Sequence, residues 1–341
     1  MAAGLCNFSF FIMIFYGLLS VPAFVLTIVA LLRKPKTFKS TFFRILIWFC
    51  GTVVFTYLIR FLISRIPLFT CGDCALASVL NTTSGYWLTV CVALQWYSGS
   101  LQALLTTLIS TDRYIVLTSV DYPVLDDLWK RYYHLAVIVV FLLPTPVSFV
   151  FLSGGSAYFS YTSQFDRYET IVPEINPYIT NYWTIGLSIV STIINVVLDV
   201  TLIRRFKVRS VWSNWRRNHE LRLFLFSCCE GCLQVLAALS AIVQVLLRGF
   251  IPALQSSSPI MTNIFLHSGD FACTFSAFAL ITMCQILRTE IQKMFGFRHQ
   301  VKPVVVFMFM QKKAVNRLAA ICMCPKYNNI RKKMYQYHSH S

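Results

Sequence analysis

The chain has little charge, and acidic residues are especially scarce. Charged residues make up 13% of its 341 residues, with 30 Lys and Arg against 13 Asp and Glu, whereas a soluble domain is usually about 25% charged. Long apolar runs separate the charged clusters, which excludes a soluble globular fold. The net charge of +17 would suggest nucleic-acid binding in a soluble protein. Here the basic residues flank apolar runs, so they indicate membrane topology, and no nucleic-acid partner is expected.

Motifs for catalysis and cofactor binding are also missing. The sequence has no HExxH zinc motif, no Gly-rich phosphate loop and no GxSxG elbow. Its six His are scattered, and none has metal-ligand spacing inside an apolar run. The last apolar run has no lysine that could form a retinal Schiff base. We therefore expect neither an enzyme nor a bound cofactor or metal.

What the chain does have is a series of long apolar runs. A helix needs about 20 mostly apolar residues to cross a bilayer, and seven such runs predict an all-α membrane protein with a seven-transmembrane helix bundle. The predicted spans are 10–32, 42–63, 87–118, 134–153, 180–203, 223–247 and 262–287. The first run is not typical of a signal peptide, because no Lys or Arg precedes it and it exceeds the usual apolar length of about 7–15 residues.

The basic residues give the predicted topology a direction. All but four of the 30 Lys and Arg residues lie in the segments that follow spans one, three, five and seven. The exceptions are Arg60, Arg65, Arg167 and Arg248. Because basic loops remain on the cytoplasmic side of a membrane, the N-terminus is predicted outside and the C-terminus in the cytoplasm.

The basic C-terminal part is expected to form two pieces. An amphipathic interfacial helix is predicted at 288–298, as the end of a seven-span domain that covers 1–298. Residues 299–341 are expected to form a basic cytoplasmic tail. Anionic lipid of the inner leaflet is the expected partner of the basic segments.

The first predicted outer loop offers cysteines and a glycosylation sequon. Cys71 and Cys74 precede Cys91 of span three, so a disulfide from either one to Cys91, or between the two, is compatible with an oxidising exterior. Asn81-Thr82-Thr83 matches the N-glycosylation pattern. The second outer loop, 154–179, has no cysteine, so it lacks the disulfide tether to span three that is usual in rhodopsin-like receptors.

The most informative triplet is Asp112-Arg113-Tyr114, at the inner end of span three. A carboxylate beside an arginine at a membrane boundary holds the arginine in one conformation. Opening the pair frees the arginine to reach neighbouring helices or a partner protein. The alternative interpretation is an interfacial salt bridge with an aromatic anchor. The position of the triplet in the third of seven spans favours the switch.

Ionisable residues inside the spans are functional candidates, because burying charge in lipid is expensive. Asp270 of span seven is the predicted acid of a ligand pocket, and His267 lies one turn before it. Glu230 of span six is expected to belong to a polar switch between helices, with Asn195 as a candidate neighbour. Asp199 is expected to form an interfacial pair with the arginine about one turn later.

The outer half of span three predicts another side of the pocket. Gln95 falls one turn after Cys91, on an aromatic and polar face of the kind that lines small-molecule sites. A buried amide needs hydrogen-bond partners, which favours the pocket interpretation for Gln95. Trp96 is a pocket candidate as well, with plain packing as the alternative.

Several short motifs occur in a characteristic order along the spans. They are Tyr16-Gly17, Val21-Pro22, Lys39-Ser40-Thr41-Phe42-Phe43, Arg65-Ile66-Pro67, Asp112-Arg113-Tyr114, Tyr122-Pro123 and Trp129-Lys130. Over residues 10–298 this order resembles the Srg superfamily of nematode serpentine chemoreceptors, class gamma or its class V relatives. The resemblance implies a seven-helix G-protein-coupled receptor for an environmental small molecule. It also implies a heterotrimeric G protein as partner, and the plasma membrane of sensory cilia as location.

The chain nevertheless departs from rhodopsin-like receptors. Span two has no Asp, span six no Cys-Trp-x-Pro, and span seven no Asn-Pro-x-x-Tyr. A small-molecule transporter and a non-signalling membrane subunit are the alternatives outside the receptor class. Transporters often have internal repeats, but no convincing repeat relates the two halves, and an odd number of spans fits a simple duplication poorly.

Overall fold

Long helices make up most of the structure. The computed structural model describes residues 2–70, 75–119, 122–162, 167–173, 177–208, 219–250, 271 and 274–295. Its helices are α1 (Ala2–Arg33), α2 (Thr41–Arg60), the π-helix η1 (Phe61–Arg65), α3 (Ile66–Phe69), α4 (Ala75–Thr82), α5 (Tyr86–Thr118), α6 (Pro123–Leu142), α7 (Thr145–Leu152), α8 (Pro177–Val208), α9 (His219–Phe250) and α11 (Gln285–Met294). A short apolar helix covers Thr274–Met283. The strands are β1 (Ser84–Gly85), β2 (Ala157–Thr162) and β3 (Arg167–Ile171).

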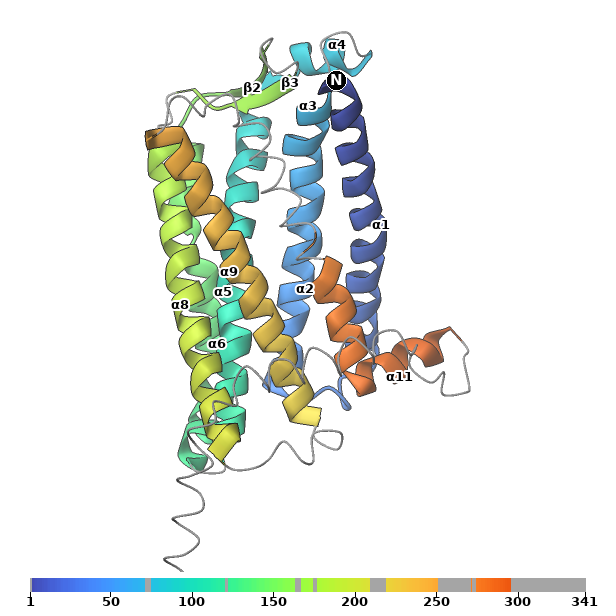
Figure 1. Cartoon of the computed structure of the whole chain (residues 1–341), viewed down its shortest axis with the longest axis vertical. Coiled ribbons are helices and arrows are strands. Elements are labelled where there is room, and N and C mark those ends of the chain that lie inside the picture. The colour runs from blue at the N-terminus through green and yellow to red at the C-terminus, as the bar shows by residue number, and fades with distance from the viewer. Residues whose placement is uncertain are drawn as a thin grey trace, which may run out of the picture. The chain divides into compact units, whose positions relative to one another are not determined.

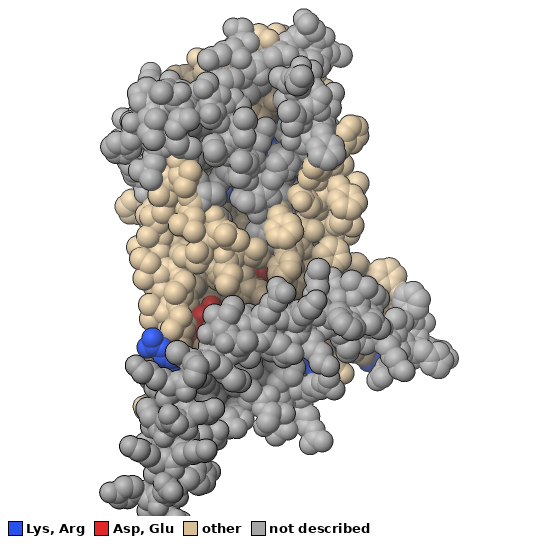
Figure 2. Space-filling model, in the orientation of Figure 1, with Lys and Arg blue, Asp and Glu red and all other residues tan. Residues whose placement is uncertain are grey.

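Five helical stretches among the described residues are long and apolar enough to cross a membrane. They are Ile14–Arg33, Thr41–Leu68, Tyr86–Thr118, Pro123–Leu152 and Ile185–Arg205, and they overlap the first five predicted spans. Helix α9 contains the whole predicted range 223–247. Of the range 262–287, the structure describes Phe271 and the residues from Thr274 onward. On the face shown in Figure 2, the described surface is mostly uncharged.

Helix α5 is the central element of the bundle. It contacts α2, α6, α7, α8 and α9, and in Figure 1 it passes behind α8 and α9. Its buried positions alternate between large apolar side chains, such as Leu101 and Leu105, and small polar ones, such as Ser98 and Ser100. Small residues allow helices to approach closely in a membrane. Any rearrangement of α5 therefore affects at least five neighbouring helices.

A small antiparallel sheet covers one end of the helices, which we call the sheet end (Figure 1). Its strand order is β1-β2-β3, with Ser84 opposite Tyr158 and Tyr161 opposite Tyr168. Beneath it, Leu88 of α5 and Phe151 of α7 pack in one apolar cluster with strand residues such as Phe159. Strands β2 and β3 both come from the segment 154–179, which the sequence predicts to be an outer loop.

Hydrogen bonds join this sheet to the start of α5. The Thr89 hydroxyl donates to the Gly155 carbonyl oxygen at 3.0 Å and accepts from the Ala157 amide at 2.9 Å. The Tyr86 hydroxyl donates to the Leu152 carbonyl oxygen at 2.9 Å. Pairing of β1 with β2 adds a backbone connection one residue before α5 begins. The segment without cysteine is thus held to α5 by hydrogen bonds.

The α2 helix widens into a π-turn before it reaches the sheet. Proline has no amide hydrogen, so Pro67 cannot bond the Ile63 carbonyl as an α-helix would require. The Thr170 hydroxyl of β3 donates to that carbonyl instead, at 2.8 Å. Just before it, the Ile66 amide bonds the Phe61 carbonyl, five residues back. Such π-turns occur frequently at functional sites.

Several helix boundaries differ from the predicted spans, and α1 begins at Ala2, eight residues before the predicted range 10–32. Helix α6 begins at Pro123, eleven residues before the predicted range 134–153, because the polar turns that precede the apolar run are helical as well. Helix α11 begins at Gln285, three residues before the helix predicted at 288–298. It is linked to neighbouring segments by an ion pair at 2.7 Å between Lys34 and Glu290. The tail 299–341 lies outside the described residues.

Candidate functional site

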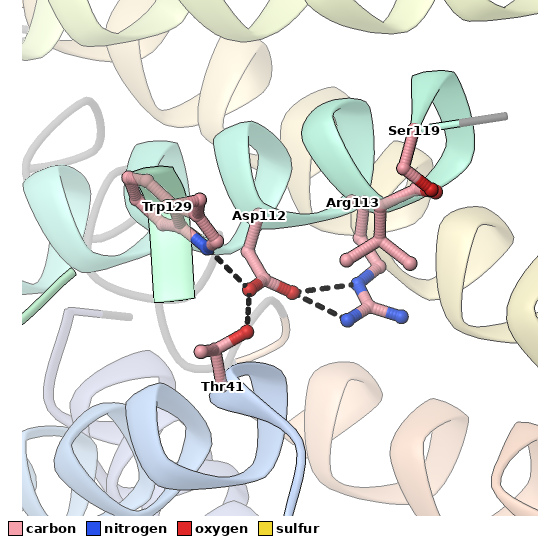
Figure 3. Close-up of polar contacts among 6 residues, drawn as sticks. Thr41, Asp112, Arg113, Ser119 and Trp129 are labelled. Carbon is pink, nitrogen blue, oxygen red and sulfur yellow. Dashed lines mark hydrogen bonds and ion pairs between the residues drawn. The ribbon is translucent and has the colours of Figure 1, made fainter. Parts of the chain in front are cut away.

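Asp112 and Arg113 lie near the end of α5 opposite the sheet, and both are almost completely buried, at 0% and 1% exposure. Figure 3 shows the Asp112 carboxylate between three elements. The indole Nε1 of Trp129 on α6 donates to Oδ1 at 2.8 Å, and the hydroxyl of Thr41, the first residue of α2, donates to the same oxygen. The other oxygen, Oδ2, accepts from Nε of Arg113 at 3.1 Å and also from Nη2. One carboxylate therefore connects α2, α5 and α6.

This arrangement compensates for the burial of two charges. A buried ion pair is favourable only when the remaining hydrogen-bonding capacity of both groups is satisfied. The carboxylate meets that condition, because each of its oxygens accepts two hydrogen bonds. The Arg113 guanidinium also lies over the Phe42 ring, 4.3 Å from its centroid, where a cation–π interaction contributes further.

A second contact joins the same helices beside this group. Nη1 of Arg44 on α2 donates to the Tyr133 hydroxyl of α6 at 2.6 Å. The third residue of the triplet, Tyr114, lies apart from both contacts and packs against Leu202 of α8 and Phe224 of α9. The triplet therefore reaches neighbours on both sides of α5. Its geometry suits a clamp that holds Arg113 until the α2–α6 side of the bundle opens.

A chain of polar contacts continues between α5, α8 and α9. The Ser110 and Ser227 hydroxyl oxygens lie 2.8 Å apart, and the Ser191 hydroxyl donates to the Ala103 carbonyl at 2.8 Å. Nδ2 of Asn195 donates to Oε1 of Gln234. Hydrogen bonds between membrane helices are worth about 1 kcal/mol each, so these contacts specify the helix register more than they stabilise the fold.

The two buried acids of this region have separate partners. Asp199, expected to pair with an arginine at the membrane edge, instead lies beside the Cys228 thiol of α9, and 8% of its surface is exposed. Glu230 hydrogen-bonds Ser276, so the structure gives Glu230 and its candidate neighbour Asn195 different partners. Within the described part of the chain, Oδ1 of Asn195, Oδ1 of Asp199 and Oε1 of Glu230 have no hydrogen-bond partner. Asn195 and Asp199 lie at the α8–α9 contact, whereas Glu230 faces the Thr274–Met283 helix.

Gln95 and Trp96, predicted to line a pocket together, point toward different helices. Oε1 of Gln95 accepts a hydrogen bond from the Ser64 hydroxyl of η1 at 2.9 Å. The Trp96 ring stacks on Phe151 of α7, with ring centroids 6.0 Å apart. Consecutive helical residues are about 100° apart around the axis, which accounts for the divergence. Gln95 thus belongs to the α2–α5 contact, and Trp96 packs beneath the sheet.

A match to a protein-family model covers most of this structure. The model describes Srg family chemoreceptors and matches residues 10–291. The chain belongs to the Srg family. It is also similar to serpentine receptor class gamma-31 of Caenorhabditis elegans, with 22% identity over 292 residues, which cover 82% of this chain and 90% of that protein. The resemblance inferred from the motifs is confirmed, and the chain is a multi-pass membrane protein of a receptor family.

Some of the remaining site residues predicted for this Srg receptor lie outside the described residues. They are His267, Asp270, Cys71 and Cys74. Cys91 is a half-buried free thiol in the structure, and the predicted disulfides stay predictions. Asn81 is exposed on α4, near the sheet, and its glycosylation stays a prediction as well.

Some residues of the receptor were not identified as site residues from the sequence. Thr41 and Trp129 appear in the sequence only as family motifs, although they are the α2 and α6 partners of Asp112. Arg65 appears in the sequence as a family motif and as an exception to the charge bias, yet it is 1% exposed. Arg65 lies two residues beyond the predicted range 42–63 but inside the apolar stretch Thr41–Leu68 of the structure, where a charge is a functional candidate.

Gly231→Ala is expected to destabilise the receptor. A Cβ at Gly231 would lie 2.9 Å from Oδ2 of Asp199, so the buried carboxylate must shift from its present contacts. Losing a buried hydrogen bond costs about 1–3 kcal/mol, which outweighs the gain of about 1 kcal/mol in helix propensity. Thermal unfolding in detergent measures the change. Gly186→Ala is the matched control, because no atom lies within 4 Å of its added Cβ; equal melting temperatures in the two variants would contradict the expectation.

Proposed function

We propose that the receptor binds an extracellular small molecule within its helix bundle and activates a heterotrimeric G protein in the cytoplasm. The sheet end faces the exterior, and the end that carries Asp112 faces the cytoplasm. Two further crossings, by α9 and by the segment that ends in the Thr274–Met283 helix, complete seven spans. The charge bias of the sequence supports this orientation, as does membership of a chemoreceptor family.

The observation that carries the proposal is the clamp on Arg113. The carboxylate of Asp112 is tied to α2 through Thr41 and to α6 through Trp129, so movement of these helices relative to α5 weakens its hold on Arg113. A ligand shifts such an equilibrium only by binding one state more tightly than the other. Ligand binding that favours the open state therefore makes Arg113 available to a cytoplasmic partner.

The direct test is nucleotide exchange on a purified G protein. Receptor in lipid nanodiscs is combined with G-protein heterotrimers, and GTP analogue uptake is measured with and without a panel of volatile and water-soluble small molecules. We expect at least one compound to accelerate exchange, and receptor-free nanodiscs to show no response. Absence of any response, with correctly folded receptor and a control receptor active in the same assay, would contradict the proposal.

Two alternatives from other classes make different predictions. A transporter would move labelled compounds across proteoliposomes without any G protein, whereas a receptor would not. A non-signalling membrane subunit would neither transport nor stimulate exchange. Neither alternative gives a role to a buried Arg113 whose ion-pair partner, Asp112, is bonded to two other helices. We further propose the plasma membrane, including the ciliary membrane of sensory neurons, as the location.

A further inference from the structure

Helix α2 and the η1 turn share a line of exposed residues, and only its first member is charged. The members recur every three or four residues, so they lie on one face of the helix. They are Arg44, Trp48, Gly51, Phe55, Leu58 and Leu62. The line covers about 27 Å along the helix, close to the hydrocarbon thickness of about 30 Å of a bilayer. Lipid chains therefore cover its apolar part, and Arg44 lies where the headgroups begin.

Arg44 is exposed, and the protein uses only part of its hydrogen-bonding capacity. In the part of the chain that the structure describes, its Nη1 atom donates to the Tyr133 hydroxyl of α6 at 2.6 Å. Its guanidinium carbon lies 5.8 Å from the centroid of the Tyr133 ring. A guanidinium has five N–H donors, so several remain for an acceptor outside the protein. Helix α2 itself contains no Asp or Glu.

Aromatic side chains join α2 to α6 one turn farther along. The Trp48 ring meets the Phe141 ring edge-on, with ring centroids 5.4 Å apart. Trp48 nevertheless remains 53% exposed, so a broad part of the indole is open to lipid. It follows Arg44 by four residues and therefore lies beside it on the same helix face. A cation at headgroup level is thus next to an aromatic surface at the level of the acyl chains.

His134 adds a second polar group beside Tyr133. The centroids of the Tyr133 and His134 rings are 3.8 Å apart, and His134 is exposed. An imidazole N–H can donate to a phosphate oxygen. The Tyr133 ring is therefore in contact with two donor side chains, Arg44 from α2 and His134 from α6. We call these residues, together with Trp48 and Phe141, the α2–α6 seam.

We propose that the α2–α6 seam binds one anionic phospholipid, with the phosphate at Arg44 and His134 and an acyl chain over Trp48. A guanidinium donates parallel charge-assisted hydrogen bonds to phosphate, and basic pockets between membrane helices bind acidic headgroups. Tryptophan favours the boundary between headgroups and chains. The sequence predicts only a general attraction between basic segments and anionic lipid, whereas the seam supplies a defined site.

The segment before α2 gives the site its preference for an acidic headgroup. Lys36 and Lys39 are exposed there, and residues 33–60 contain no Asp or Glu. Phosphatidylcholine also has a phosphate, but these cations repel its choline group. Phosphatidylserine instead offers a carboxylate as a further acceptor. The assignment to the cytoplasmic leaflet rests on the proposed function, because it uses the orientation given there.

The experiment measures quenching of tryptophan fluorescence by lipid in nanodiscs that hold one full-length receptor each. Phosphatidylcholine discs receive a rising fraction of phosphatidylserine whose acyl chains carry bromine near the headgroup. A reference series uses phosphatidylcholine brominated at the same positions. The chain has seven Trp, so the signal of Trp48 is obtained as the difference from a Trp48→Phe receptor. We expect phosphatidylserine to half-quench Trp48 at a fraction about ten-fold lower than phosphatidylcholine, the range of one charge-assisted hydrogen bond.

Variants separate this site from general attraction and from folding. Arg44→Gln is expected to remove the preference, and Arg44→Lys to retain part of it, because lysine keeps the charge but not the parallel hydrogen bonds. Arg131→Gln is the matched control, since this exposed arginine of α6 lies over Tyr132 instead; it should keep the preference. His134→Gln leaves the bond between Arg44 and Tyr133 in place and should weaken the preference several-fold. Thermal unfolding checks that each variant is folded.

The other outcomes overturn the proposal. Equal quenching by the two lipids would mean that an ordinary zwitterionic lipid covers the seam. A preference that survives Arg44→Gln, or that Arg44→Gln and Arg131→Gln reduce equally, would reflect general attraction alone. No quenching of Trp48 by either lipid would mean that the seam is closed to lipid. The assay contains no G protein, so each of these results leaves the proposed signalling function intact.

Discussion

Asp112→Asn is expected to raise ligand-independent signalling by about ten-fold or more. The asparagine oxygen replaces Oδ1, which accepts from Thr41 and Trp129, while its NH2 group replaces Oδ2, which accepts from Arg113. The substitution thus retains the links to α2 and α6 and selectively removes the ion pair. Breaking a buried ion pair costs about 3 kcal/mol or more, and part of that free energy shifts the equilibrium toward the state in which Arg113 is released. Basal reporter activity, normalised to surface display, measures the effect.

Two further variants delimit this prediction. Asp126→Asn removes an exposed ion pair with Lys130 on α6. Exposed pairs contribute little to stability, so the basal signal of this variant should remain unchanged. Arg113→Ala should abolish coupling, alone or combined with Asp112→Asn, while ligand binding persists. An Arg113→Ala receptor that binds ligand normally and signals at full strength would refute the role assigned to this arginine.

Gly17→Ala is expected to give the largest loss of stability. A Cβ at Gly17 of α1 would lie 1.8 Å from the hydroxyl oxygen of Tyr57 and 2.3 Å from its Cζ. Either α1 and α2 move apart or the Tyr57 ring leaves Arg65. Overpacking costs about 1–3 kcal/mol, occasionally more, and here the contact is with a ring that is held between two partners, Phe61 and Arg65. We expect a cost of about 3 kcal/mol and poor surface display.

A double-mutant cycle tests the cause of that loss. Tyr57→Ala removes the ring, so combining it with Gly17→Ala should cost less than the sum of the two single changes. Thermal unfolding in detergent provides the measurement, and Gly51→Ala of α2 is the open-space control. Additive effects would mean that Gly17 is needed for a reason other than its contact with Tyr57.

Run length and charge placement predict much of the helical framework. The candidate spans overlap the first five predicted ranges, since apolar length is a property of the local sequence. The start of α6 was predicted too late because Asp126 and Lys130 form helix turns outside the apolar run, where hydropathy carries no signal. The π-turn in α2 was not predicted, because it depends on a hydroxyl from β3, more than a hundred residues away.

The same contrast holds for the site: adjacent residues can be recognised in the sequence, whereas partners that are far apart in the sequence cannot. Asp112 and Arg113 are adjacent and could be selected as a pair from the sequence alone. Their partner Thr41 lies 71 residues away from Asp112, so only the folded chain shows that the carboxylate bridges helices. Arg60 and Arg65 were treated as exceptions to a topological rule, although charges that violate such a rule are the ones that need a functional explanation.

The attachment of the sheet to α5 has a consequence for the redox conditions under which it persists. Thr89, Tyr86 and the β1–β2 pairing make this attachment from oxygen and nitrogen atoms alone. It therefore forms without an oxidase or isomerase during biosynthesis. A reducing environment leaves this attachment intact.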